Sequence, residues 1–132
     1  MEESNKKTIW IVEDDEGISE ITALILNENG YITNQIDNQD DLFKKLDLEK
    51  PDLILLDIFL YNANGIEIAA RIKSANLTKN IPIIIMSADT QIEVKIQNTD
   101  VDDYIKKPFE LKEFLAKVEK HLSNGLNLIQ AA

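Results

Sequence analysis

Short β-branched and apolar runs alternate with amphipathic stretches along this 132-residue chain. The runs span residues 8–12, 31–36, 52–57, 83–86 and 101–105. Runs of this kind are typical of strands, and two of them, 52–57 and 83–86, are apolar enough to indicate strands buried on both faces. Strict alternation of strands and helices predicts parallel strands joined by right-handed crossovers. We therefore expect an α/β fold, a doubly wound five-stranded parallel sheet with helices on both faces.

The stretches between the runs carry helix signals. Helices are predicted over residues 16–29, 38–48, 65–73, 90–98 and 111–122, and residues 58–64 are predicted to form a loop. In the first helix Ile18, Ile21, Leu24 and Ile25 recur at helical spacing, so this face is expected to pack inward. In the last helix Asn124 and Gly125 are predicted to end the element, which would leave residues 126–132 as a tail.

Charge and residue usage exclude several classes of function. The chain has 14 Lys and Arg against 24 Asp and Glu, a net charge of −10, which argues against direct binding of nucleic acid. It has no cysteine and one histidine, His121, so thiolate chemistry and a histidine zinc site are excluded. No apolar run approaches a membrane span and no secretory signal opens the chain, so we expect no membrane association and a cytoplasmic location.

Chemically useful side chains stand at the ends of the predicted strands. In a doubly wound sheet the ligand site lies at the carboxyl ends of the strands, where the strand order reverses. The residues expected there are Glu13, Asp14, Asp57, Ser87 and Lys107. Three carboxylates brought together would repel one another unless one took up a proton or a cation intervened. Mg²⁺ suits such a set because it takes oxygen ligands. A carboxylate can also attack phosphorus to form an aspartyl phosphate, while Mg²⁺ and an ammonium group offset the charge.

Four motifs resemble those of the receiver domain of two-component response regulators. They are IVEDDEG after the first strand, LILLDIFLYNANGIE around the third, IIIMSAD at the fourth and DDYIKKPF at the fifth. The resemblance runs from residue 8 to residue 122 and implies a flavodoxin-like receiver fold. It also implies that phosphate is accepted from a phosphohistidine on a histidine kinase or a histidine phosphotransfer protein. We assign residues 1–125 to a receiver domain and residues 126–132 to a C-terminal tail.

The resemblance implies roles at the acidic end of the site. Asp57 would be the phosphoacceptor. Asp14 would bind Mg²⁺ directly, Glu13 would act mostly through water, and the backbone carbonyl of Phe59 would be a further ligand.

The resemblance also implies the residues that respond to phosphorylation. Ser87 would be the switch hydroxyl, Lys107 the ammonium that pairs with the phosphoryl group, and Tyr104 the aromatic residue whose rotamer changes on activation. The bond between Lys107 and Pro108 is expected to be cis, which an X-Pro bond permits at small cost.

Three positions depart from the family pattern or stand out beside the site. Tyr61 stands where the family usually has proline, so the loop after the phosphoacceptor is expected to be less rigid. Asp100 replaces a common glycine before the fifth strand. Phe59 is bulky and apolar, and we hypothesise that it hinders attack by water and lengthens the life of the aspartyl phosphate.

The predicted function is a phosphoacceptor signalling switch that changes its surface for an unknown output partner. It would catalyse at most its own phosphorylation and dephosphorylation. The alternative is an Mg²⁺-dependent phosphatase or phosphotransferase working through an aspartyl phosphate, but such enzymes usually need a second acid two residues after the nucleophile, where Phe59 stands. A flavin or dinucleotide module is disfavoured because the four glycines form no glycine-rich phosphate loop.

Overall fold

The structure is a computed structural model that describes residues 6–131, with side chains for residues 6–122. Its centre is the predicted parallel sheet of five strands in the order β2-β1-β3-β6-β7. The strands are β1 (Thr8–Val12), β2 (Ile32–Ile36), β3 (Leu53–Asp57), β6 (Ile83–Ser87) and β7 (Asp103–Lys106). All neighbouring strands pair in parallel, as predicted, and the strand order reverses between β1 and β3.

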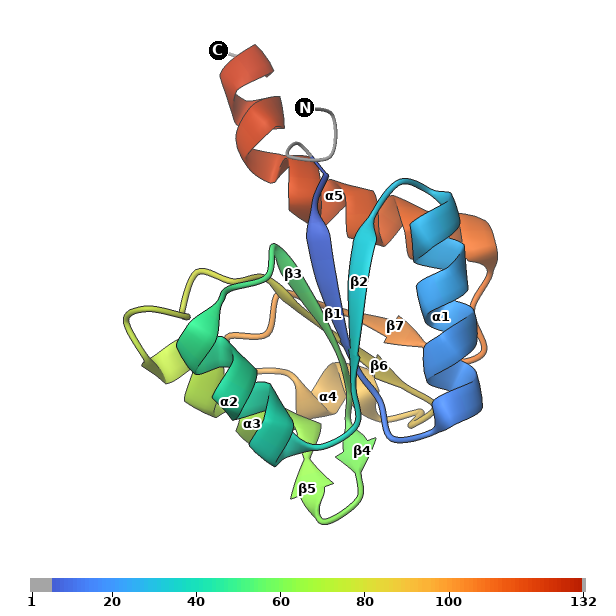
Figure 1. Cartoon of the computed structure of the whole chain (residues 1–132), viewed down its shortest axis with the longest axis vertical. Coiled ribbons are helices and arrows are strands. Elements are labelled where there is room, and N and C mark those ends of the chain that lie inside the picture. Colours follow the sequence, from blue (N-terminus) through green and yellow to red (C-terminus); the bar gives the residue numbers. More distant parts are fainter. Residues whose placement is uncertain (1–5, 132) are drawn as a thin grey trace.

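Helices cover both faces of the sheet (Figure 1). The helices are α1 (Glu16–Glu28), α2 (Gln39–Leu48), α3 (Gly65–Ser74), α4 (Ile92–Lys95) and α5 (Leu111–Ala131). One apolar layer joins the sheet to α2, α3 and α4 and includes the fully buried Trp10. The other joins it to α1 and α5 and includes the fully buried Phe114. β3 and β6 lie between the two layers, which explains their unbroken apolar sequences. Among the described residues, no helix is both long and apolar enough to cross a membrane.

The inward face predicted for α1 is wrong for Ile18, Ile21 and Leu24, whereas Ile25 is half-buried and packs against the second apolar layer. The helix buries Ser19, Thr22, Ala23 and Leu26, whereas Ile18, Ile21 and Leu24 are 38%, 55% and 51% exposed. The polar residues can face the sheet because their hydroxyls are paired: Thr22 donates to the carbonyl of Ile18 at 2.7 Å, and Ser19 accepts from the side chain of Gln35 at 3.0 Å. Hydrophobic periodicity alone could not distinguish the two faces, because large aliphatic residues stand on both: Leu26 is fully buried, whereas Ile21 and Leu24 are exposed.

Residues 58–64 contain a small hairpin instead of the predicted loop. β4 (Phe59–Leu60) pairs antiparallel with β5 (Ala63–Asn64) across a two-residue turn. Asn62 takes a positive φ of 59° in the turn, a conformation that asparagine tolerates better than most residues. The buried side chain of Leu60 anchors the hairpin to the core, and the hairpin projects beyond the carboxyl end of the central strand β3 (Figure 1).

Two helix predictions also need correction. The helix expected over residues 90–98 is reduced to four residues, Ile92–Lys95, because no side chain caps its start and Asn98 adopts a positive φ of 65° after it. The last helix continues through Asn124 and Gly125 to Ala131. A helical glycine costs only about 1 kcal/mol relative to alanine, so it need not end a helix. The proposed boundary at residue 125 therefore falls within α5.

Candidate functional site

The strand order brings three predicted acidic residues together at one rim of the sheet. Glu13 and Asp14 follow β1, and Asp57 ends the adjacent strand β3. One carboxylate oxygen from each residue lies within 4.8 Å of the others. Glu13 is buried, Asp57 is half-buried and Asp14 is exposed, so the cluster opens toward solvent on the side of Asp14. These donors are all oxygens, and a hard cation such as Mg²⁺ fits them.

Lys107 reaches the same cluster from the end of β7. Its Nζ lies 2.9 Å from Glu13 Oε1 and 3.6 Å from Asp57 Oδ2. Its backbone N–H donates to the carbonyl of Ser87 at 2.8 Å, which continues the pairing of β6 with β7. The following peptide bond, to Pro108, is cis as predicted. The sheet therefore positions the ammonium group between two carboxylates that are far away in the sequence.

Asp57 is poorly stabilised as an anion. Its burial and its contact with Glu13 raise the pKa of its carboxyl group to about 6, even though Lys107 and the Phe59 N–H favour the charged form. The single positive charge of Lys107 thus does not compensate the negative charges of both Glu13 and Asp57. This imbalance is the electrostatic reason why a divalent cation suits the site.

Backbone N–H groups also hold the acids. Asp57 Oδ1 accepts from the N–H of Phe59 at 3.3 Å, and Asp14 Oδ2 accepts from the N–H of Tyr61 at 2.7 Å. Asp15 is the N-cap of α1, where its Oδ1 accepts from the N–H of Ile18 at 3.0 Å. Sequence reasoning missed the Tyr61 contact, since a backbone donor leaves no trace in residue type.

Gly65 allows the third strand and its following helix to approach each other. A Cβ atom at this position would lie 2.4 Å from the carbonyl oxygen of Asp57 and 2.8 Å from the Cα of Ile58. Neither backbone atom could move away without shifting the end of β3. Glycine at this helix start is therefore required by close packing beside Asp57.

Ser87 lies at the end of β6, adjacent to β3, and is buried. Its hydroxyl oxygen accepts from the N–H of Asp89 at 2.9 Å. Asp89 forms an ion pair with Lys95, and this contact lowers the pKa of its carboxyl group. Lys95 Nζ also lies 5.5 Å from the centre of the Phe59 ring. Asp89 and Lys95 were not among the predicted site residues, because only folding brings α4 next to the hairpin.

Tyr104 is not part of the acidic cluster. Its hydroxyl is hydrogen-bonded to Glu93 in α4, a contact that raises the pKa of the tyrosine. Lys117 of α5 lies 4.7 Å from the centre of its ring, and Lys106 pairs with Glu93 at 3.2 Å. Tyr104 thus links α4, β7 and α5 on the surface next to the site.

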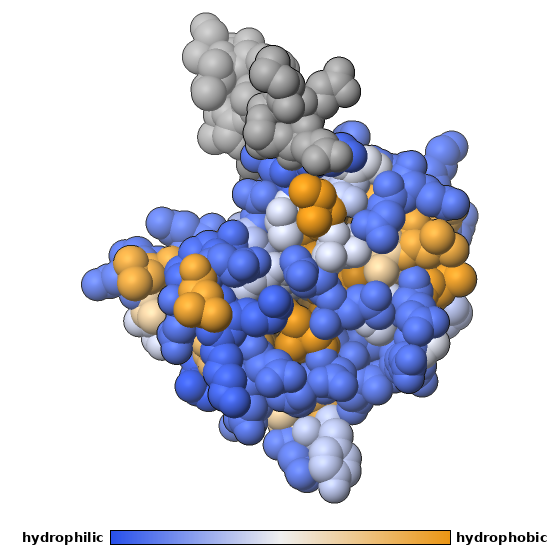
Figure 2. Space-filling model, viewed as in Figure 1, coloured by the Kyte–Doolittle hydropathy of each residue, from blue (hydrophilic) through white to orange (hydrophobic). Residues whose placement is uncertain are grey.

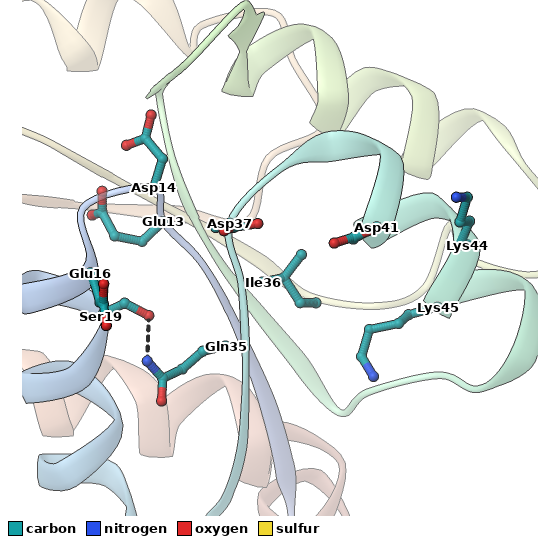
Figure 3. A pocket seen from close by; sticks show the side chains of 10 residues that line it. All are labelled: Glu13, Asp14, Glu16, Ser19, Gln35, Ile36, Asp37, Asp41, Lys44 and Lys45. Carbon is teal, nitrogen blue, oxygen red and sulfur yellow. Dashed lines mark hydrogen bonds between the residues drawn. The ribbon is translucent and has the colours of Figure 1, made fainter.

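A pocket of about 530 Å³ adjoins the cluster between the start of α1 and α2 (Figure 3). Glu13 and Asp14 contribute to its lining, while Lys44 and Lys45 lie across it on α2. Asp37 and Asp41 add further acids. The acidic cluster therefore borders an open, predominantly acidic hollow.

Comparison with known proteins matches residues 9–119 to the response regulator receiver domain. The chain is 42% identical over 115 residues to the phosphate regulon transcriptional regulatory protein PhoB of Pseudomonas aeruginosa, an alignment that covers 86% of this chain and 50% of PhoB. This chain thus spans about half the length of that relative.

Two solved structures share the fold. The signal receiver domain of a signal transduction histidine kinase from Syntrophus aciditrophicus aligns with a TM-score of 0.83 and 29% identity, over 89% of this chain and 91% of that one. The receiver domain of the sensor histidine kinase PA1611 from Pseudomonas aeruginosa, which has a magnesium ion coordinated in its active-site cleft, aligns with a TM-score of 0.80 over 89% of this chain and 98% of that one. At 21% identity, this second likeness concerns the fold alone.

Proposed function

Because this chain belongs to the family of response regulator receiver domains, the phosphoacceptor signalling switches of two-component systems, we propose that Asp57 is the residue that accepts the phosphoryl group. The observation that carries the proposal is the position of Lys107, whose ammonium group lies between Glu13 and Asp57. A group transferred to Asp57 would arrive beside a fixed positive charge. Electrostatic positioning of this kind is the main requirement for phosphoryl transfer.

The donor we propose is a phosphohistidine on a histidine kinase or a histidine phosphotransfer protein. An oxygen of the Asp57 carboxylate forms a bond to phosphorus while the P–N bond of the donor breaks. The imidazole nitrogen takes the electron pair, and the ring, protonated on its other nitrogen, leaves as neutral imidazole. Lys107 offsets the negative charge that the phosphoryl oxygens bring to the site.

Receiver domains bind Mg²⁺ at an acidic cluster, and here we propose Asp14, Asp57, the carbonyl of Phe59 and, through water, Glu13 as the groups that hold it. When bound, Mg²⁺ supplies positive charge that offsets the charge on the phosphoryl group. The raised pKa of Asp57 supports the assignment, because the protein by itself leaves that carboxylate undercompensated.

We propose Ser87 and Tyr104 as the residues that pass the signal outward. The buried Ser87 hydroxyl lies on the strand adjacent to that of Asp57 and could turn toward a phosphoryl oxygen. Tyr104 sits between α4 and α5, so a change in its rotamer would alter the surface formed by α4, β7 and α5. Phosphorylation would thus shift the equilibrium between two conformations of this surface, and an output partner would bind one of them.

The exposed side of α1 is our proposed docking surface for the phosphohistidine protein. Ile18, Ile21 and Leu24 form an apolar face on the helix that begins immediately after the acidic cluster. Hydrophobic side chains gather on the surface over this helix (Figure 2). Exposed apolar side chains next to a reactive site favour binding of a protein over binding of a small substrate.

The phosphatase alternative is not favoured. Its second acid would stand two residues after the nucleophile, where this chain has Phe59. The domain acts as a signalling switch, and we propose that its only catalysis concerns its own phosphorylation and dephosphorylation. We further propose that residues 1–125 form the receiver unit and that the protein works in the cytoplasm.

Incubation with acetyl phosphate and Mg²⁺, followed by intact mass measurement, tests the proposal. We expect the addition of one phosphate, its loss in Asp57→Asn, and its suppression by a chelator. Phosphorylation of Asp57→Asn to the wild-type extent would contradict the assignment. Continuous turnover of a small phosphate ester would favour the enzyme alternative instead.

A further inference from the structure

One edge of the β4–β5 hairpin aims two backbone donors at the acidic cluster. The N–H of Phe59 donates to Asp57 Oδ1, and the N–H of Tyr61, two residues later, donates to Asp14 Oδ2. Phe59 lies in β4 and Tyr61 is the first residue of the turn that follows it, so the two contacts arise from a single segment. The hairpin therefore contacts two of the three carboxylates.

The Tyr61 contact is the shorter of the two, at 2.7 Å. A carboxylate has two oxygens, and a donor fixed on Oδ2 restrains the rotation of the group while Oδ1 stays free. Asp14 is exposed and has no close cation among the ion pairs of the described side chains, so this N–H is the contact that orients it.

We propose that the backbone N–H of Tyr61 is a positioning group that holds the Asp14 carboxylate ready for Mg²⁺. The inference rests on the proposed function, because it concerns the same metal site. It predicts that the hairpin contributes to metal affinity through its backbone, whichever side chain occupies position 61.

The hairpin is anchored well enough to act in this way. Leu60 is buried and pairs with Ala63, and the N–H of Gly65 donates to the carbonyl of Ile58 at 2.7 Å. These contacts fix the chain on both sides of Tyr61. The exposed Tyr61 side chain, by contrast, is not held in the core.

The identity of residue 61 decides whether the contact can exist. The receiver family usually has proline at this position, and proline has no N–H to donate. The turn would accept it, because only its second central residue, Asn62, has a positive φ, and such turns favour proline at the first central position. Tyr61→Pro therefore removes the donor with little strain, while Tyr61→Ala removes the side chain and keeps the donor.

Calorimetric titration with Mg²⁺ alone distinguishes the two effects. We expect Tyr61→Ala to bind Mg²⁺ within about twofold of the wild-type Kd and Tyr61→Pro to bind more weakly by about tenfold or more, as for loss of one hydrogen bond to a charged group. Equal affinity in wild type and Tyr61→Pro would overturn the inference, and so would equal weakening in both variants. Failure of the wild-type chain to bind Mg²⁺ would overturn the proposed function as well.

A second measurement does not depend on the folding of the proline variant. In amide spectra of the metal-free chain, Asp14→Ala should shift the Tyr61 N–H markedly, because it removes the acceptor. Asp47→Ala, at an exposed aspartate of α2 that does not line a pocket with Tyr61, serves as the matched acidic control. A Tyr61 amide that is unmoved by Asp14→Ala would show that the contact is absent and the inference wrong.

Discussion

At the residue scale, Asp57 is an acid whose negative charge the protein leaves poorly compensated. Burial and the nearby Glu13 raise its pKa to about 6, from 3.8 for an unperturbed aspartate. Asp57 therefore binds a proton more tightly in the folded chain than in the unfolded chain. Its contribution to the free energy of unfolding is fully present below about pH 4 and is lost as the pH rises through about 6.

This sign predicts how Asp57→Asn changes stability without metal. Between about pH 5 and pH 7.5 in a chelator, the wild-type free energy of unfolding should fall relative to that of Asp57→Asn by about 1 kcal/mol, a value reduced for solvent screening. Urea unfolding of both proteins measures the difference, and groups common to both, such as His121, cancel. A difference that stays constant with pH would contradict the prediction.

At the scale of the element, the two faces of α1 have different roles: one packs against the sheet and stabilises the fold, and the other is exposed. Its packed face includes Ser19, Thr22, Ala23 and Leu26, whereas three of its large aliphatic residues are exposed, namely Ile18, Ile21 and Leu24. A helix that exposes isoleucine and leucine while burying serine and threonine gains little stability from its outer face. The outer face is therefore available for binding a partner.

Ile21→Ser tests this division of α1. We expect the free energy of unfolding to change by less than about 0.5 kcal/mol, because Ile21 is exposed, whereas Leu26→Ala should cost about 2–5 kcal/mol. Phosphoryl transfer from a phosphorylated kinase that serves the wild-type chain should slow, while phosphorylation by acetyl phosphate should not. If both donors slowed equally, α1 would be acting on the site itself and not on docking.

At the scale of the whole molecule, the site joins parts of the chain that are far apart in sequence. Glu13 and Asp14 follow β1, Asp57 ends β3, and Lys107 follows β7. The site exists only when these strands are paired in the observed order. A ligand that needs the assembled cluster must therefore stabilise the whole fold.

Mg²⁺ should accordingly raise the melting temperature of the wild-type chain. At a concentration about 100 times its Kd, the stabilisation should approach about 2.7 kcal/mol, and Asp14→Ala should lose most of it. Differential scanning calorimetry with Mg²⁺ or with a chelator measures the effect. The same rise in Asp14→Ala would show that Mg²⁺ acts elsewhere on this acidic protein.

The fold class and the residues of the acidic rim could be predicted from the chain itself. Leu53–Leu56 and Ile83–Ile85 are apolar without interruption because both faces of a central parallel strand are covered, and this pattern is visible in the sequence. The carboxyl ends of such strands share one edge, so Asp14 and Asp57 could be placed together before any coordinates.

Only the tertiary structure decided which face of α1 packs inward, where the last helix ends, and how the hairpin meets the site. Ile18 and Ile21 have the periodicity of a buried face, but Ser19 packs inward because Gln35 of β2 donates to its hydroxyl, while Thr22 satisfies its hydroxyl on the carbonyl of Ile18 within the helix. The Tyr61 donor belongs to the backbone, which is the same in every residue except proline. Periodicity reports what a side chain prefers, whereas these outcomes depend on which neighbours folding supplies.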